Sequence, residues 1–287
     1  MNIGVFGAGA WGTALAYTCA KSGNEVIHWG FNGFFDGLVD LPKPDSVVRT
    51  SDMADLQQCE YWLIVTPAAF FRETVRKMRA VYANQPILIC TKGMESDSGK
   101  FMSEILNEEM PNCKDFGILS GPQFAREVAV GVPTGSTLAG NKRVRAGAHI
   151  ALSSLYLQDC DDIIGTQICG VGKNAVSLIS GYLTEKSNGE NERALLFTRA
   201  WDEIAELGVE MGANCKTFLG LCGVGDLFLS ATSPTSRNFS AGLSIARGEQ
   251  IVGTVEGIFA LRGLIKRAKV LKIQTPILLE MKEKMGL

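Results

Sequence analysis

The sequence predicts an α/β protein, with a doubly wound parallel sheet in its N-terminal part and an all-helical domain after it. The chain opens with an apolar strand, a glycine-rich turn and a helical pattern. Short apolar runs then alternate with helical segments, which is typical of a parallel sheet whose strands are buried on both faces. Beyond residue 163 the strand pattern mostly disappears and helical periodicity replaces it. We therefore expect two domains, residues 1–163 and residues 164–287.

The glycine-rich turn reads GAGAWG and lies between an expected strand at residues 2–6 and a helical run at 13–21. This is the G-x-G-x-x-G pattern in the strand–turn–helix context in which it binds a dinucleotide. Gly7 permits the tight turn, Gly9 lets a pyrophosphate approach the backbone, and Gly12 lets the helix pack closely on the sheet. The first domain is therefore predicted to be a Rossmann-type dinucleotide-binding domain. A plain strand–helix turn without a ligand is the alternative.

The second expected strand, residues 25–29, ends without the residue that usually reveals the choice of dinucleotide. An Asp or Glu at this point favours NAD, and an Arg nearby favours NADP. The following residues, Gly30, Phe31 and Asn32, include neither. Asn32 could bond a ribose 2′-hydroxyl and Phe31 could stack near an adenine, so NAD and NADP both stay open.

The later apolar runs predict three more strands, at residues 61–65, 86–90 and 116–120. Helical patterns lie around residues 70–83, 98–110 and 142–155. Ligands of open parallel sheets bind beyond the carboxyl ends of the strands. Lys92 lies directly after the second of these strands, where it would meet a substrate or a phosphate. The alternative interpretation of Lys92 is a solvated surface lysine.

Composition excludes several classes of function. The 287 residues carry a net charge of −2 and contain no basic block, which argues against a nucleic-acid partner. The longest apolar runs have strand length, and the N-terminus lacks the basic start of a signal peptide, so no membrane insertion is expected. The eight cysteines are scattered without a C-x-x-C pair, which is typical of reduced thiols in a cytoplasmic protein.

The chain has only two histidines, His28 in an expected strand and His149 in an expected helix. We therefore expect neither a histidine-based metal site nor a catalytic triad. Acid–base chemistry would have to be carried by Lys, Asp or Glu.

Helices are expected in the second half at residues 168–185, 190–213 and 254–271. Lys173 lies near the start of the first of these and precedes a strongly apolar stretch. Partial desolvation there would lower the pKa of a lysine toward a useful range, whereas a lysine that merely extends to water is the ordinary alternative. Asp226 follows a glycine-rich stretch, where it either caps a helix or serves chemistry.

The run Ser236-Arg237-Asn238 follows Pro234 and is expected to form a turn. The planar guanidinium of an arginine suits phosphate oxygens, and hydrogen-bonding neighbours would complete a phosphate site. A surface arginine without a ligand is the alternative.

Several segments of the chain, in their order along the sequence, resemble the bacterial-type NAD(P)-dependent glycerol-3-phosphate dehydrogenases. The similar segments are GAGAWGTALA (7–16), TKGME (91–95), GPQFAREVAVGVPT (121–134), KNAVSLISG (173–181), ERALLFTRA (192–200), TFLGLCGVGDLFLSAT (217–232), SRN (236–238) and VEGIFA (255–260). The resemblance implies the reversible reduction of dihydroxyacetone phosphate to sn-glycerol 3-phosphate, a phospholipid precursor, with NAD or NADP as cofactor. A phosphorylated small molecule is the expected partner, and a homodimer is left open.

The resemblance also implies a role for each matching residue. The catalytic residues would be Lys173 as general acid and base, Asp226 beside it, and Lys92. Cofactor contacts are implied at Gly7, Gly9, Ala10, Trp11, Gly12, Phe31, Lys92, Ala125, Arg237 and Glu256. Substrate contacts are implied at Lys92, Gly121, Gln123, Lys173, Asp226, Ser236, Arg237 and Asn238.

The chain departs from the family pattern at a few places. Gln123 replaces a small Ser or Thr, and the segment between Trp29 and Val47 is shortened, as is the C-terminus. Two alternatives therefore accompany the main interpretation. One is a related two-domain dehydrogenase acting on a hydroxy acid or a ketopantoate-like compound, and the other is a dinucleotide-binding protein with reduced activity.

Overall fold

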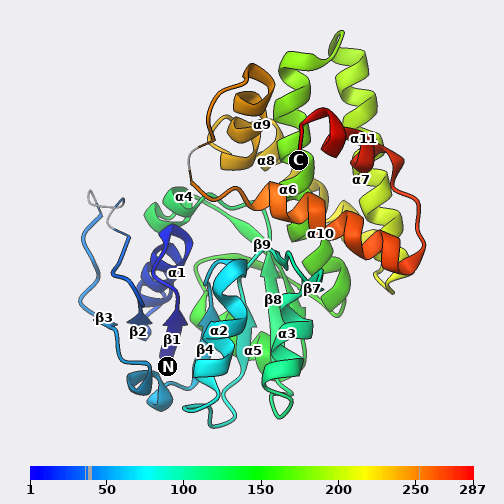
Figure 1. Cartoon of the computed structure of the whole chain (residues 1–287). Coiled ribbons are helices and arrows are strands. Elements are labelled where there is room, and N and C mark those ends of the chain that lie inside the picture. The colour runs from blue at the N-terminus through cyan, green and yellow to red at the C-terminus, as the bar shows by residue number, and fades with distance from the viewer. Residues whose placement is uncertain (36, 38–40, 252) are drawn as a thin grey trace. The chain divides into compact units, whose positions relative to one another are not determined.

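A computed structural model describes residues 1–35, 37, 41–251 and 253–287 (Figure 1). The chain divides into two compact units. Unit 1 consists of Met1–Lys92, Met102–Leu119 and Gln123–Ile163, and unit 2 of Gly93–Phe101, Ser120–Pro122 and Ile164–Leu287. Two segments that the sequence places in the first domain, Gly93–Phe101 and Ser120–Pro122, thus pack with the second unit.

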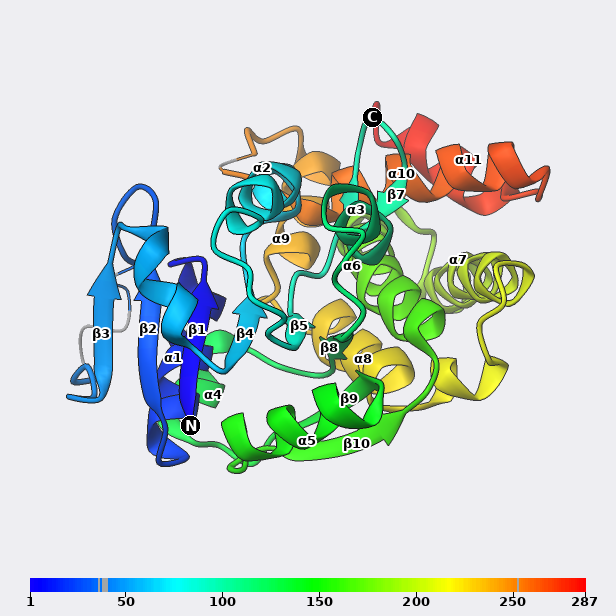
Figure 2. The ribbon, with the colours of Figure 1, turned by 90° about the horizontal axis from the view of Figure 1, so that it is seen from below.

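Unit 1 is built on an eight-stranded sheet with the strand order β10-β9-β8-β5-β4-β1-β2-β3 (Figure 2). Its strands are β1 (Asn2–Phe6), β2 (Glu25–Trp29), β3 (Val47–Thr50), β4 (Tyr61–Ile64), β5 (Ile87–Ile89), β8 (Phe116–Ser120), β9 (Gly135–Gly140) and β10 (Tyr156–Cys160). β1 is an interior strand and pairs in parallel with both β2 and β4. The predicted doubly wound α/β fold is confirmed.

The prediction missed three strands of this sheet, β3, β9 and β10. β3 and β10 are edge strands with several exposed or half-buried side chains, so they lack a continuous apolar run. β9 is buried, but its sequence GSTLAG contains only one large apolar residue, Leu138. Pairing with neighbouring strands, which the local sequence does not reveal, makes these segments extended.

Helices cover both faces of the sheet in unit 1 (Figure 2). One face packs against α1 (Ala10–Lys21) and α5 (Lys142–Ala151), in a core that includes Leu15 and Val144. The other face packs against α2 (Ala68–Met78) and α3 (Met102–Glu109), in a core that includes Phe71 and Ile105. Both α2 and α5 end several residues before the sequence pattern predicts.

The first turn of α1 corrects one boundary. The helix begins at Ala10, three residues before the predicted start at Thr13, so Gly12 lies inside it. A Cβ atom on Gly12 would come within 1.8 Å of the carbonyl oxygen of Gly7. Glycine is therefore required at position 12 for the backbone of the turn to approach the helix.

His28 is buried in β2, and its Nε2 donates to the carbonyl oxygen of Gly7 at 3.0 Å. Burial lowers the pKa of His28 from 6.5 to about 4. In the unfolded chain the His28 imidazole therefore becomes protonated near pH 6.5, whereas in the folded chain it becomes protonated only near pH 4. We expect the free energy of unfolding to fall, by an amount on the order of 3 kcal/mol, as the pH drops through this window. Urea unfolding of the native chain and of His28→Gln at several pH values tests this, since the variant should lack that share of the loss.

Unit 2 is mostly helical, and residues 164–287 contain no strand among those described. Its helices are α6 (Ile163–Lys186), α7 (Glu190–Glu210), α8 (Asp226–Ala231), α9 (Arg237–Arg247), α10 (Glu256–Leu271) and α11 (Pro276–Lys284). A small antiparallel hairpin, β6 (Met94–Glu95) with β7 (Lys100–Phe101), joins this unit from earlier in the chain. The second unit is thus not entirely helical, because an element that precedes residue 163 packs into it.

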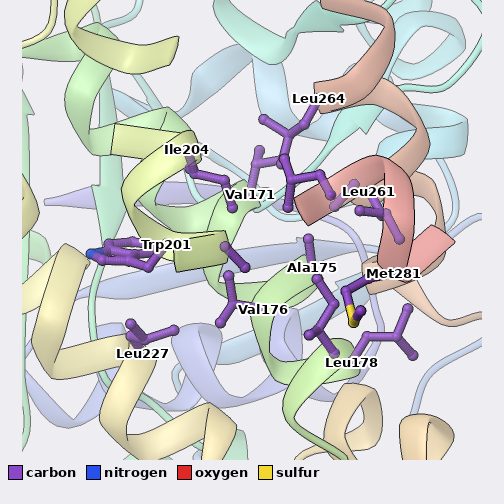
Figure 3. Packing of buried hydrophobic residues seen from close by; sticks show 14 of the residues in the cluster. Val171, Ala175, Val176, Leu178, Trp201, Ile204, Leu227, Leu261, Leu264 and Met281 are labelled. Atoms are coloured by element: carbon purple, nitrogen blue, oxygen red, sulfur yellow. The ribbon is translucent and has the colours of Figure 1, made fainter. Parts of the chain in front are cut away.

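The core of unit 2 surrounds α6, most of whose residues are buried (Figure 3). Val171 and Ala175 of α6 pack in one cluster with Ile204 of α7, Leu264 of α10 and Met281 of α11. A helix whose apolar residues lie on most of its surface is stable only when neighbouring helices cover them. None of the described helices combines the length and the apolarity that a bilayer crossing requires.

Glu203 of α7 is a buried carboxylate that caps another helix of unit 2. Its Oε1 accepts from the backbone N–H of Ile277 at 2.7 Å, and its Oε2 from that of Leu278 at 3.0 Å. These N–H groups belong to the first turn of α11, which has no partner for them within the helix. Glu203→Leu leaves both donors buried and unpaired, so we expect a loss of about 2–4 kcal/mol in the free energy of unfolding. Chemical denaturation measures this loss, and Glu206→Leu, one turn later on α7, is the matched control.

Candidate functional site

The glycine turn of unit 1 forms an open cradle at the N-terminus of α1. Gly7 adopts φ +121°, and its N–H donates to the carbonyl oxygen of Trp29 at the end of β2. Gly9 is the N-cap residue of α1, and a Cβ atom added there would meet nothing within 4 Å. The space in front of Gly9 is therefore free for a ligand. Backbone N–H groups at a helix N-terminus suit the oxygens of a pyrophosphate.

A cavity of about 460 Å³ adjoins this cradle within unit 1. Its walls are the glycine turn, the segment after β2 that holds Phe31, and the side of α2 that holds Phe70 and Lys77. Phe31 is 66% exposed and presents an aromatic ring to the cavity. The aromatic walls and the volume fit the adenosine part of a dinucleotide whose pyrophosphate lies against Gly9. Residues 36 and 38–40, part of the shortened segment after Trp29, lie outside the described residues.

Other predicted contacts of unit 1 follow the carboxyl ends of its strands. Lys92 comes three residues after the end of β5, and Ala125 is the first residue of the short helix α4 (Ala125–Val130), which follows β8. Both amide atoms of Gln123 are buried and have no hydrogen-bond partner in the described part of the chain. A buried amide without hydrogen-bond partners costs free energy. A bound ligand that hydrogen-bonds to the Gln123 amide would recover this cost and would bind more tightly.

Unit 2 brings Lys173 and Asp226 together, from α6 and α8. Lys173 Nζ lies 3.3 Å from Asp226 Oδ1 and donates to Ser230 Oγ at 3.0 Å. Ser230 Oγ in turn donates to Asp226 Oδ1 at 3.1 Å. The Asp226 side chain is fully buried and that of Lys173 is 12% exposed. The three side chains form a closed triangle in which each group fixes the other two.

Ser230 completes this triangle, although the sequence analysis did not assign it a role. It lies four residues after Asp226 on the same helix, so both side chains lie on one face. The spacing of four residues indicates a shared helix face only when the segment is already known to be a helix. The six-residue α8 is too short to give a periodic pattern in the sequence.

The structure corrects the setting of both charged residues. Lys173 lies in the middle of the long helix α6, not near its start, because α6 begins at Ile163. Asp226 is the first residue of α8, one position after the N-cap residue Gly225. It therefore does not occupy the N-cap position that was the alternative to a chemical role. A buried carboxylate requires a compensating charge, and Lys173 provides it.

The run Ser236-Arg237-Asn238 is the start of helix α9 and not the predicted turn. Ser236 is the N-cap residue, and its hydroxyl accepts from the N–H of Phe239 at 3.4 Å. Asn238 donates to Asn174 Oδ1 at 2.8 Å and accepts from the N–H of Gly257 at 2.9 Å. Two of the three residues thus have structural partners in unit 2.

Asn238 of α9 is therefore hydrogen-bonded to both α6 and α10. Asn174 is the residue next to Lys173 on α6, and Gly257 follows Glu256 at the N-terminus of α10. The side chain of Asn238 thus fixes α6, α9 and α10 relative to one another. These three helices carry Lys173, Arg237 and Glu256. Gly121, in the segment Ser120–Pro122, also belongs to unit 2.

An open glycine turn at a helix N-terminus in one unit and a buried lysine–carboxylate pair in the other are together typical of a nicotinamide-dependent dehydrogenase. Family models match both parts of it: the NAD-dependent glycerol-3-phosphate dehydrogenase N-terminus over residues 2–146 and the corresponding C-terminus over residues 162–283. The chain belongs to the NAD-dependent glycerol-3-phosphate dehydrogenase family.

Curated relatives agree with this assignment. Glycerol-3-phosphate dehydrogenase [NAD(P)+] of Nitrosomonas europaea is 35% identical, with 96% of this chain and 91% of that protein covered. The protein of the same name from Afipia carboxidovorans is 36% identical, with 96% and 89% covered.

Solved structures share the fold over nearly the whole chain. A glycerol-3-phosphate dehydrogenase from Coxiella burnetii superposes with a TM-score of 0.89 at 28% identity, covering 99% of this chain and 94% of that one. A ketopantoate reductase from Ralstonia eutropha shares the fold at 15% identity, with a TM-score of 0.65 and coverage of 100% and 97%. The two-domain architecture therefore extends beyond the family.

Proposed function

We propose that this protein catalyses the reversible reduction of dihydroxyacetone phosphate to sn-glycerol 3-phosphate with NAD or NADP. The observation that carries the proposal is the buried Lys173–Asp226 pair, with its 3.3 Å separation, in a chain that also has an open glycine cradle. Membership of the family supports this choice of substrate, since the family model and the curated relatives are both named for glycerol 3-phosphate. The product would supply phospholipid synthesis.

In the proposed mechanism Lys173 handles the proton. A nicotinamide dinucleotide held at the glycine turn of Gly7, Gly9 and Gly12 would supply the hydride that reduces the substrate carbon C2. Negative charge develops on the C2 oxygen during reduction, and the ammonium of Lys173 stabilises it and gives it a proton. Asp226 and Ser230 hold Lys173 in position. Lys92 is proposed as a second cationic contact to the cofactor and the substrate.

The remaining roles are proposed from the same set of residues. Arg237 binds the substrate phosphate, and that remote binding energy positions the carbonyl for reaction. Ser236, Asn238, Gly121 and Gln123 complete the substrate contacts. Gly7, Gly9, Ala10, Trp11, Gly12, Phe31, Ala125, Arg237 and Glu256 are proposed to contact the cofactor.

The proposed phosphate contact gives a specific prediction. Arg237→Ala removes the guanidinium at the start of α9, so we expect the KM for dihydroxyacetone phosphate to rise roughly tenfold to a hundredfold, which is the loss of 1.4–2.8 kcal/mol of binding. Steady-state kinetics with varied substrate measure it. Arg247→Ala, at the other end of the same helix and paired with Glu185, is the matched control. An unchanged KM in Arg237→Ala would refute the phosphate role.

The direct test of the proposed activity follows the oxidation of NADH and of NADPH by the purified chain, with dihydroxyacetone phosphate present or absent. Loss of reduced cofactor that depends on the substrate supports the proposal. Binding of dinucleotide without turnover would instead favour a changed substrate, and would direct attention to Gln123 with its unpaired amide.

We also propose that the protein acts in the cytoplasm. None of the eight cysteines, all of which lie in the described part of the chain, forms a disulfide, and six of them are buried, as in proteins of reducing compartments. A homodimer is proposed as its assembly, and light scattering of the purified chain measures that directly.

A further inference from the structure

The cavity beside the glycine turn of unit 1 contains a charged pair from one face of α2. Lys77 Nζ lies 2.7 Å from Glu73 Oε1 and 4.3 Å from the centre of the Phe31 ring. All three residues line the cavity. Because Phe31 belongs to the segment after β2, the ammonium of Lys77 connects that segment with α2.

Among the described residues, the charges of this pair cancel in the lining of the cavity. Glu73 and Lys77 are its only charged members among the described residues, and they neutralise one another. The segment from Gly30 to Phe35 adds neither an acid nor a base. Arg49 of β3 packs its guanidinium 4.8 Å from the centre of the Phe34 ring and does not line the cavity.

A neutral cavity discriminates between the two dinucleotides. The 2′-phosphate of NADP carries a charge of about −2 at neutral pH, and its desolvation is repaid by an arginine or a lysine that is available to bind it. The single lysine of this cavity is already held by a carboxylate. The 2′-hydroxyl of NAD is uncharged and needs one hydrogen-bond partner, which the amide of Asn32 can provide.

We infer that Glu73 makes this cavity prefer NAD(H) over NADP(H), because it pairs with Lys77, the lysine in the described lining of the cavity. The inference rests on the proposed cofactor site and adds the choice of cofactor to it. In NAD sites an Asp or Glu at the end of β2 usually sets this preference, and here Glu73 of α2 would set it instead. It would do so by pairing with the ammonium of Lys77.

Fluorescence titration of the purified full chain with NADH and with NADPH tests the inference. The native chain should bind NADPH at least about tenfold more weakly than NADH, the size of one lost charge contact. Glu73→Gln frees Lys77, so the Kd for NADPH should fall roughly tenfold while that for NADH stays within about twofold. The double variant Glu73→Gln/Lys77→Met should lose the gain, which assigns it to Lys77.

The control is Glu25→Gln, which makes the same change of charge at the opposite end of β2 and should alter neither affinity. Equal affinities of the native chain for both nucleotides would overturn the inference. An unchanged ratio of affinities in Glu73→Gln would also overturn it, while leaving the proposed function intact. Failure of both nucleotides to bind would overturn the proposed cofactor site itself, and the inference with it.

Discussion

Replacing Lys173 by alanine is expected to lower kcat roughly 10²–10⁴-fold, which is the usual contribution of a positioned proton donor. The same change leaves the fully buried Asp226 without its compensating charge. Removing one partner of a buried ion pair typically costs about 3–5 kcal/mol in stability. The loss of activity must therefore be separated from a loss of folded protein.

The double variant Lys173→Met/Asp226→Asn makes this separation. Both charges are removed together, so the free energy of unfolding should lie closer to that of the native chain than in Lys173→Ala. The kcat should stay as low as in the single variant, because no proton donor remains. Lys186→Ala, an exposed lysine at the end of the same helix, is the control and should be fully active. Near-normal turnover by the double variant would show that Lys173 is not the acid.

The glycines of the cradle should respond differently to the addition of one methyl group. Gly9→Ala places a Cβ atom in open space, so we expect no loss of stability. That space is where a pyrophosphate would lie, so the Kd for NADH should rise at least about tenfold. In Gly12→Ala the Cβ atom would come within 1.8 Å of the Gly7 carbonyl oxygen, and the backbone must move. We expect a loss of about 1–3 kcal/mol in stability together with weaker binding.

Thermal unfolding and calorimetric titration with NADH distinguish these outcomes. A stable Gly9→Ala variant with unimpaired affinity for NADH would show that the pyrophosphate does not lie against this residue. A stable Gly12→Ala variant would mean that the helix can shift away from the sheet without cost.

The parts of this protein that the sequence predicted are those with a local physical cause. Strands β1, β2 and β8 have the predicted bounds, because each is an apolar run that ends at a turn or polar segment. The glycine turn could be recognised because a tight approach of backbone to ligand and to helix requires glycine at fixed spacing. The family could be recognised from segments that keep their order along the chain.

The errors came from elements whose conformation depends on distant partners. The edge strand β10 is extended because it pairs with β9, and its own residues give no apolar pattern. The start of α9 was expected to be a turn, because the run follows Pro234. In the structure the same residues cap α9 and connect it with α6 and α10.

By itself, the sequence determined the class of fold, the glycine cradle and the identity of the charged residues, since these depend on residue type and on spacing of a few positions. Only the tertiary structure decided which of those residues meet. Lys173 and Asp226 are 53 positions apart, and it is the packing of α8 on α6 that buries the carboxylate against the ammonium and adds Ser230 to both. The contact of Lys77 with Phe31 likewise joins two distant segments. Such contacts arise from the burial of apolar faces against one another, which fixes distances that no local pattern contains.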